Sequence, residues 1–143
     1  PGGRSAFIRA MNNKARQLGM RNSRFYDSTG LSTRNVSTAR DLAKLITAAY
    51  RQPLIRQFTQ DTNKEMRFST PAYSLMFNNT NPLVKNPDWD VRLSKTGYTD
   101  EAGRCLLMRA KPDRQELAIV LLNSVGKRTP IGDANRIRKW LKS

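Results

Sequence analysis

The chain has 143 residues, the size of one ordinary domain, and its 26 Lys and Arg against 11 Asp and Glu give a net charge of +15. Such a charge indicates an anionic partner, whereas the 38% hydrophobic content excludes a wholly disordered tail, and the single cysteine, Cys105, excludes an internal disulfide scaffold. No apolar run approaches the roughly 18 residues of a membrane span, and the first residues do not resemble a signal peptide. The chain contains no histidine, so a catalytic base that acts at neutral pH would have to be another residue type.

The first residues predict a helix. Ser5 is a candidate N-cap, and the apolar positions from Phe7 to Leu18 recur every three or four residues, as one buried helix face requires. Gly19 suits the left-handed conformation that often ends a helix.

A loop over residues 21–36 leads to a second predicted helix. The hydroxyl of either Ser37 or Thr38 can cap it, Thr38 and Asp41 have the spacing of a capping box, and Pro53 limits how far this helix can extend. The stretch 54–89 is ambiguous, because its prolines and asparagines break it into short extended pieces and turns.

Three strands follow in a predicted antiparallel meander. Residues 90–96 alternate apolar and polar, residues 100–103 can form a turn, and residues 105–109 form the second strand, in which we expect Cys105 to be buried. Residues 117–122 are continuously apolar, which predicts layers on both faces and further strand neighbours, so that the chain supplies part of a larger sheet. Strands flanked by helices indicate an α+β fold.

A basic helix is predicted at the end of the chain, over residues 136–142. Ile137, Trp140 and Leu141 make its apolar face, so we expect Trp140 to pack the helix onto the sheet, and Trp89 to cap the entry to the first strand. No helix-turn-helix, zinc-finger or single-strand-binding pattern is present, and we therefore expect no nucleic acid as partner.

One motif has mechanistic content. Lys95-Thr96-Gly97 ends a predicted strand and matches the third signature of penicillin-binding proteins and class A β-lactamases. A tripeptide can occur by chance, in which case Lys95 is simply an exposed lysine of an edge strand.

The surroundings of the motif are more specific. The whole chain resembles the C-terminal part of the low-molecular-mass D-alanyl-D-alanine peptidases, which are serine peptidases of the penicillin-binding protein type. The resembling segments are Phe7–Ala15, Leu18–Met20, Phe25, Thr29–Ser32, Asn35–Leu42, Asn79–Asn81, Lys95–Thr99, Ala102–Leu106 and Asp133–Arg136. The resemblance implies the DD-peptidase/β-lactamase-like transpeptidase fold, an antiparallel sheet flanked by helices, with residues 1–143 as the C-terminal half of the catalytic domain.

The resemblance also implies roles for four residues. Lys95 would be a fixed cation that holds the substrate carboxylate and assists proton movement around the nucleophile. Thr96 would offer its hydroxyl to the same carboxylate, and Gly97 would leave the strand edge bare for an extended peptide. The backbone N–H of Tyr98 would be one of two oxyanion-hole donors.

The nucleophile of this family lies in Ser-x-x-Lys, followed by Ser-x-Asn, and both motifs precede Lys-Thr-Gly. The only Ser-x-x-Lys here begins at Ser124, after Lys95, and we interpret it as a coincidence. Ser37 is followed by Arg40, which cannot act as a base, and no Ser-x-Asn occurs. We therefore expect no nucleophile in this chain, which could not be acylated by itself.

The implied activity is hydrolysis of D-Ala–diamino acid cross-links of peptidoglycan through an acyl-enzyme, which β-lactam antibiotics trap. The alternatives are a D-alanyl-D-alanine carboxypeptidase of the same family and, in another class, a non-catalytic basic module that binds an anionic polymer. The implied partners are peptidoglycan peptides, β-lactams and the N-terminal half of the same protein as a separate chain. We expect the protein to be located in the bacterial periplasm, with its signal peptide in the absent upstream segment. We expect it to use neither a metal nor a cofactor.

Overall fold

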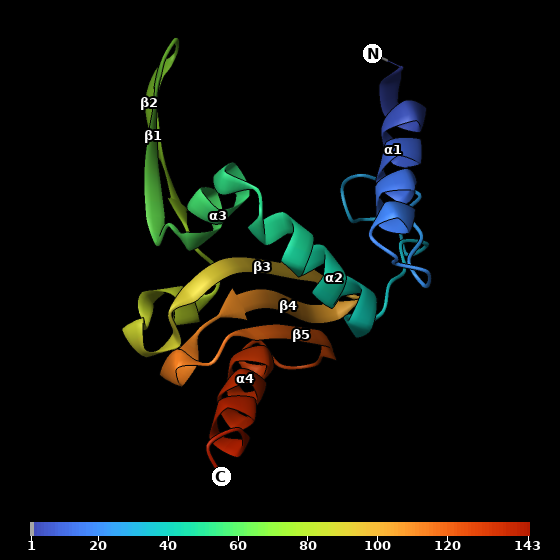
Figure 1. The fold of residues 1–143 in the computed structure, drawn as a ribbon. Helices are drawn as coiled ribbons and strands as arrows, with labels where there is room; N and C mark the ends of the chain where they lie inside the picture. Colours follow the sequence, from blue (N-terminus) through green and yellow to red (C-terminus); the bar gives the residue numbers. More distant parts are fainter. Residues whose placement is uncertain (1) are drawn as a thin grey trace.

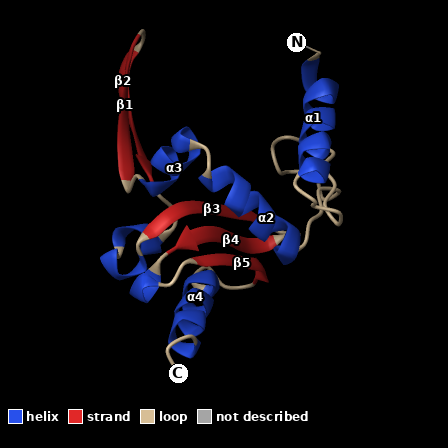
Figure 2. Cartoon of the chain, viewed as in Figure 1, coloured by secondary structure: helices blue, strands red, loops and turns tan. Residues whose placement is uncertain are grey.

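The computed structural model describes residues 2–143. The main sheet has three strands, and Figure 1 shows helices on both sides of it; Figure 2 marks the helices, strands and loops by colour. The helices and strands are α1 (Gly3–Gln17), α2 (Ala39–Tyr50), α3 (Pro53–Gln60), β1 (Asn63–Ser69), β2 (Ala72–Asn78), β3 (Val91–Thr99), β4 (Gly103–Ala110), β5 (Leu117–Ser124) and α4 (Thr129–Trp140). No helix among these residues is both long enough and apolar enough to cross a membrane.

The central sheet is antiparallel in the order β3-β4-β5, so the predicted meander is confirmed. Helix α4 packs against β4 and β5 on one face, where Met108 pairs with Ile119 and both belong to the same buried cluster as Ala134 of α4. On the other face, α2 packs against the same two strands, and the guanidinium of Arg109 lies 4.2 Å from the ring centroid of Tyr50. Successive residues of a strand point to opposite faces, so the register decides which side chains meet which helix.

The last strand is covered on both faces but not along its outer edge. The expected layers are present, because α2 and α4 contact β5 from the two sides of the sheet. Among residues 2–143, however, β5 pairs only with β4, and Leu122 near its end is 39% exposed. The expectation of further strand neighbours is not met by this part of the protein and stays a prediction.

Trp89, and not Trp140 as expected, joins α4 to the sheet. Trp89 is fully buried in the core between the sheet and α4, and its Nε1–H donates to Oδ1 of Asn135 on α4 at 3.2 Å. Trp140 was expected to hold α4 on the sheet, but it is 72% exposed, because the buried face of α4 runs through Pro130 and Ala134 instead. The indole that joins α4 to the sheet therefore comes from the segment before β3.

The helix ends follow the sequence signals only in part. Helix α1 begins at Gly3, before Ser5, and its N-cap is Gly2 with no side-chain hydrogen bond, so the Ser5 cap was wrong. Gly19 has φ +71°, as predicted. At α2, Thr38 accepts a hydrogen bond from the backbone N–H of Asp41 at 3.2 Å, which confirms one half of the capping box.

The other half of the capping box does not form, because the Asp41 carboxylate turns toward the preceding loop. It accepts hydrogen bonds from the backbone N–H of Asn22 at 2.8 Å and the hydroxyl of Ser23 at 2.9 Å, and Lys44 lies 3.3 Å away. Burial opposes ionisation of Asp41, but these donors outweigh it and hold the pKa of the carboxyl below its usual range. Asp41 therefore anchors the loop to α2.

The ambiguous stretch resolves into α3 and a hairpin. Pro53 does not merely end α2; it occupies the first turn of α3, where its missing N–H costs nothing. Strands β1 and β2 pair only with each other, and the hairpin projects from the same side of the body as α1 (Figure 1). The cross-strand register places five apolar or aromatic side chains on one exposed face of the hairpin: Met66, Phe68, Tyr73, Leu75 and Phe77.

The contrast between the tryptophans predicts unequal effects of substitution. Trp89→Ala leaves a cavity in the core and an unpaired Asn135, so it should lower the free energy of unfolding by about 3–5 kcal/mol. Trp140→Ala at the exposed position should change it by less than about 0.5 kcal/mol. Urea unfolding of the 143-residue chain followed by circular dichroism measures both values, and equal losses would contradict the burial described above.

The Asp41 contacts predict a pH-dependent stability. Because the pKa of Asp41 is lower in the folded state, the carboxylate stabilises the fold above its ordinary pKa, near 4, and that contribution is lost as the pH falls further. Asp41→Asn should melt several degrees below the unsubstituted chain at pH 7, and the difference should narrow at pH 3. Thermal melts across this range test it; a constant difference would show that the charge has no part in the stabilisation.

Candidate functional site

The predicted site residues lie together on β3, which forms one edge of the three-stranded sheet. Thr96 pairs with Leu106 and therefore faces the side of the sheet that α4 covers, whereas Lys95 pairs with Leu107 and faces the side of α2. Lys95, Gly97 and Tyr98 are exposed. A ligand that lies along the strand edge, rather than on one face, can contact both Lys95 and Thr96.

A pocket of about 580 Å³ opens beside this strand on the α4 side. Thr96, Gly97 and Tyr98 form one wall, while Lys95 does not line the pocket. The remaining lining residues are Thr80, Pro82, Arg104, Cys105, Leu106, Lys127, Arg128, Pro130 and Ile131. The lining includes three cations and no carboxylate, so the pocket suits an anionic group.

Thr96 is held by a loop that precedes β3 in the sequence. Its Oγ1 lies 2.6 Å from Oγ1 of Thr80, so one of the two hydroxyls donates to the other. The next residue, Asn81, is fully buried, and its Nδ2 donates to Oγ of Ser94 at 2.9 Å. The amide of Asn79 donates to main-chain oxygens at the end of α3, at 3.1 Å and 3.0 Å. The loop is therefore tied at three successive residues, and Thr80 has a defined place beside the motif.

Tyr98 is fixed by charges on either side of its side chain. Its hydroxyl donates to Oδ1 of Asp100 at 2.6 Å, and this hydrogen bond raises the pKa of the Tyr98 phenol. The guanidinium of Arg104 lies 4.3 Å from the ring centroid. The phenol therefore stays neutral, and the strand end that carries the Tyr98 main-chain N–H is braced.

Several residues of the pocket were not among the predicted site residues. Thr80, Arg104 and Cys105 belong to segments that carry the resemblance, but nothing in their spacing indicates that they meet Thr96. Arg128 has no local signal, because it lies in a turn between β5 and α4. Cys105 was expected to be buried; it is partly exposed and lines the pocket.

The one Ser-x-x-Lys spacing does not form a nucleophile site. Ser124 is a buried residue at the end of β5, not at the start of a helix, so Lys127 does not lie one helical turn after it. Lys127 instead contributes to the lining of the pocket. These positions support the interpretation that the spacing is a coincidence.

The sequence matches one known family. The family model described as D-alanyl-D-alanine carboxypeptidase (Peptidase_S11) matches residues 1–126. Two curated relatives are 48% identical over 143 residues, the whole of this chain: a D-alanyl-D-alanine endopeptidase of Pseudomonas aeruginosa and another of Escherichia coli. The chain spans about half the length of these relatives, 46% in each case.

The fold agrees with that match. The crystal structure of the Streptomyces K15 DD-transpeptidase superposes with a TM-score of 0.86 at 26% sequence identity, over 95% of this chain and 53% of the other. The α+β transpeptidase fold expected from the sequence is thereby confirmed. On the extent of the sequence match and on this likeness, the chain belongs to the D-alanyl-D-alanine carboxypeptidase family of peptidases.

Proposed function

We propose that this chain provides the Lys-Thr-Gly wall of the active site of a serine-type DD-endopeptidase that hydrolyses D-Ala–diamino acid cross-links of peptidoglycan in the bacterial periplasm. The observation that carries the proposal is the position of Lys95-Thr96-Gly97 on an exposed sheet edge beside a cationic pocket, in a chain of this family. The relatives named as endopeptidases favour the cross-link over a terminal D-alanine as the scissile site.

The proposed reaction proceeds through an ester intermediate. A serine hydroxyl attacks the D-alanyl carbonyl carbon, its proton passes to the departing amine, and the peptide C–N bond breaks. Water then attacks the ester and releases the new D-alanyl carboxylate, which restores the serine. The backbone N–H of Tyr98 donates to the carbonyl oxygen while that oxygen carries negative charge.

Substrate orientation comes from the two faces of the strand edge. The hydroxyl of Thr96, held by Thr80, offers a hydrogen bond to the carboxylate next to the scissile bond, and Lys95 adds a positive charge from the other face. Arg104 and Arg128 line the pocket on the side of Thr96 and attract the same carboxylate. Since Gly97 has no side chain and, apart from its chain neighbours, nothing lies within 4 Å of the place a Cβ would occupy, an extended peptide can approach the strand.

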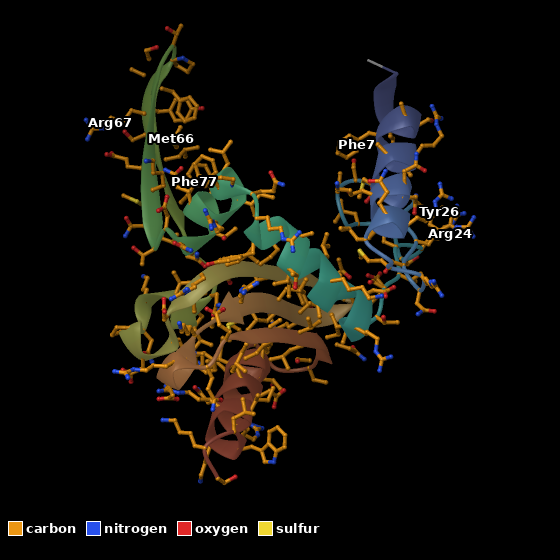
Figure 3. All side chains as sticks on the ribbon, viewed as in Figure 1. Phe7, Arg24, Tyr26, Met66, Arg67 and Phe77 are labelled. Carbon is orange, nitrogen blue, oxygen red and sulfur yellow. The ribbon has the colours of Figure 1, made fainter. Side chains whose placement is uncertain are left out.

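We propose that the Ser-x-x-Lys and Ser-x-Asn segments lie in the part of the protein that the relatives have and this chain does not span, so that residues 1–143 are the C-terminal half of the catalytic domain. Two exposed apolar surfaces, one on α1 and one on the hairpin of β1 and β2, support the proposal that a further segment packs against this chain. Figure 3 shows Phe7 on the side of α1 toward the hairpin, and Met66 and Phe77 on the side of the hairpin toward α1, while Arg67 points away. A segment that packs between the two would cover side chains that are 44–59% exposed here.

Penicillin labelling tests the role of Lys95. In the intact protein, Lys95→Ala removes the cation at the strand edge and should slow acylation by a fluorescent penicillin at least about a hundredfold. The matched control is Lys139→Ala, an exposed lysine on α4 away from the pocket, which should label normally. Absence of labelling in the unsubstituted protein would refute the peptidase proposal.

Product analysis separates the endopeptidase from the carboxypeptidase that the family description names. Incubation with purified cross-linked dimeric muropeptides should convert them to monomers, with little release of free D-alanine from pentapeptide monomers. Liquid chromatography with mass detection measures both products. Release of D-alanine without cleavage of the dimers would assign the carboxypeptidase activity instead.

A further inference from the structure

The beginning of the chain concentrates positive charge, of which one ion pair neutralises only a small part. Residues 2–26 contain five arginines and one lysine and no Asp or Glu. The first acid, Asp27, lies 3.7 Å from Arg4. Among the ion pairs of residues 2–143, none includes the other four arginines of this segment, which are Arg9, Arg16, Arg21 and Arg24.

These four arginines line one groove. It has a volume of about 510 Å³, and its other lining residues are Ile8, Asn12, Asn13, Met20 and Ser23. Arg9 and Arg16 come from α1, whereas Arg21 and Arg24 come from the loop that returns along the helix. The groove is therefore a concave surface that presents guanidinium groups from two sides and no carboxylate.

The two sides of the groove are joined by the side chain of Asn12. The amide of Asn12 donates to the main-chain oxygen of Phe25 at 2.7 Å and accepts from the main-chain N–H of Phe25 at 2.9 Å. Within α1, the guanidinium of Arg16 donates to Asn13. Beyond the groove, Arg24 and Arg34 lie 5.5 Å and 3.8 Å from the ring centroid of Tyr26. The loop is thus held against α1, which keeps the groove open without a ligand.

The groove lies on the opposite side of α1 from its apolar face. Phe7, Met11 and Leu18 line an apolar hollow with Leu45 of α2, and at 100° per residue Arg9 and Arg16 lie about half a turn around the helix from them. Figure 3 agrees, with Phe7 on the side toward the hairpin and Arg24 and Tyr26 on the outer side. A segment that covers the apolar face leaves the groove open to solvent.

We propose that this arginine groove is a second binding site of the protein, which holds the carboxylates of a peptidoglycan stem peptide away from the Lys-Thr-Gly strand. The identity of the ligand rests on the proposed function, since stem peptides carry free carboxylates beside their cross-links. Guanidinium groups bind carboxylates in pairs of parallel hydrogen bonds, which suits four arginines around one hollow. Such a site would retain the protein on the wall between cleavage events.

The shape of the site favours a flexible chain over a duplex or a membrane. A duplex or a bilayer is much wider than this hollow, so its phosphates would meet the rim of the groove rather than its interior. A volume of about 510 Å³ is that of a pocket for a short segment of a thin chain. Of its two apolar lining residues, Ile8 is half-buried and Met20 is buried, so neither is free to enter a bilayer.

Sedimentation with purified peptidoglycan sacculi tests the site. The intact protein is first acylated with penicillin, so that the catalytic site does not contribute to binding. The triple variant Arg9→Gln, Arg16→Gln and Arg21→Gln should bind about tenfold or more weakly than the unsubstituted protein, because it removes three of the four guanidinium groups that line the groove and would pair with carboxylates. The matched control removes three exposed cations outside the groove: Arg51→Gln, Arg136→Gln and Lys139→Gln. It should retain most of the binding.

Two further measurements make the outcome decisive. Conversion of the sacculus carboxylates to amides should abolish the difference between the variants, and penicillin labelling should be the same in both. An equal loss in the groove and control variants would overturn the proposal, because it would show a charge effect without a site. So would a groove-specific loss seen with anionic phospholipid vesicles or duplex DNA but not with sacculi. If the unsubstituted protein does not label with penicillin, the peptidase proposal fails, but sedimentation without acylation still compares the binding of the variants to sacculi. Failure of the peptidase proposal is therefore distinguishable from failure of the groove proposal.

Discussion

The buried amide of Asn81 is the contact on which the candidate active site depends. It has no exposure to solvent, and a buried amide is stable only when its donors and acceptors are paired. Its donation to Ser94 and its acceptance from the main-chain N–H of Leu83 supply those partners. The loop is thereby docked against β3, and Thr80 comes within hydrogen-bond distance of Thr96. A polar interaction in the core thus sets the geometry of a polar group at the surface.

The positions of the few acids decide where the excess positive charge is concentrated. Asp41 is engaged by the loop before α2, and Asp113 accepts from Arg138 at 2.7 Å and lies 2.7 Å from Lys142, which lowers the pKa of the Asp113 carboxyl. Acids bound in this way cannot neutralise the remaining cations. The surplus lines two concave surfaces, the pocket beside β3 and the groove along α1, and no carboxylate lines either one. The excess of Lys and Arg in the composition is thus concentrated at the pocket beside β3 and at the groove along α1.

The elements that could be predicted are those whose signal is local. The meander of β3, β4 and β5 follows from alternation and turn residues, and the Thr38 cap follows from its spacing to the N–H of Asp41. The hairpin of β1 and β2 is only partly predictable: extended pieces and turns are expected in this stretch, but the pairing of the two strands has no signal because their apolar residues are exposed rather than packed against a core. Trp140 shows the same difficulty: periodicity identifies an apolar helix face, but not which of its residues meets the sheet.

The sequence by itself determined the family, the α+β class and the Lys95-Thr96-Gly97 motif, because these are carried by residue types in a fixed order along the chain. Only the tertiary structure decided that the motif lies on a sheet edge, that Thr80 and Arg128 share its pocket, and that the early arginines form a groove. The physical reason is that these contacts join residues far apart in the chain. Their positions follow from strand register and from buried partners such as Asn81, neither of which has a signature in local spacing.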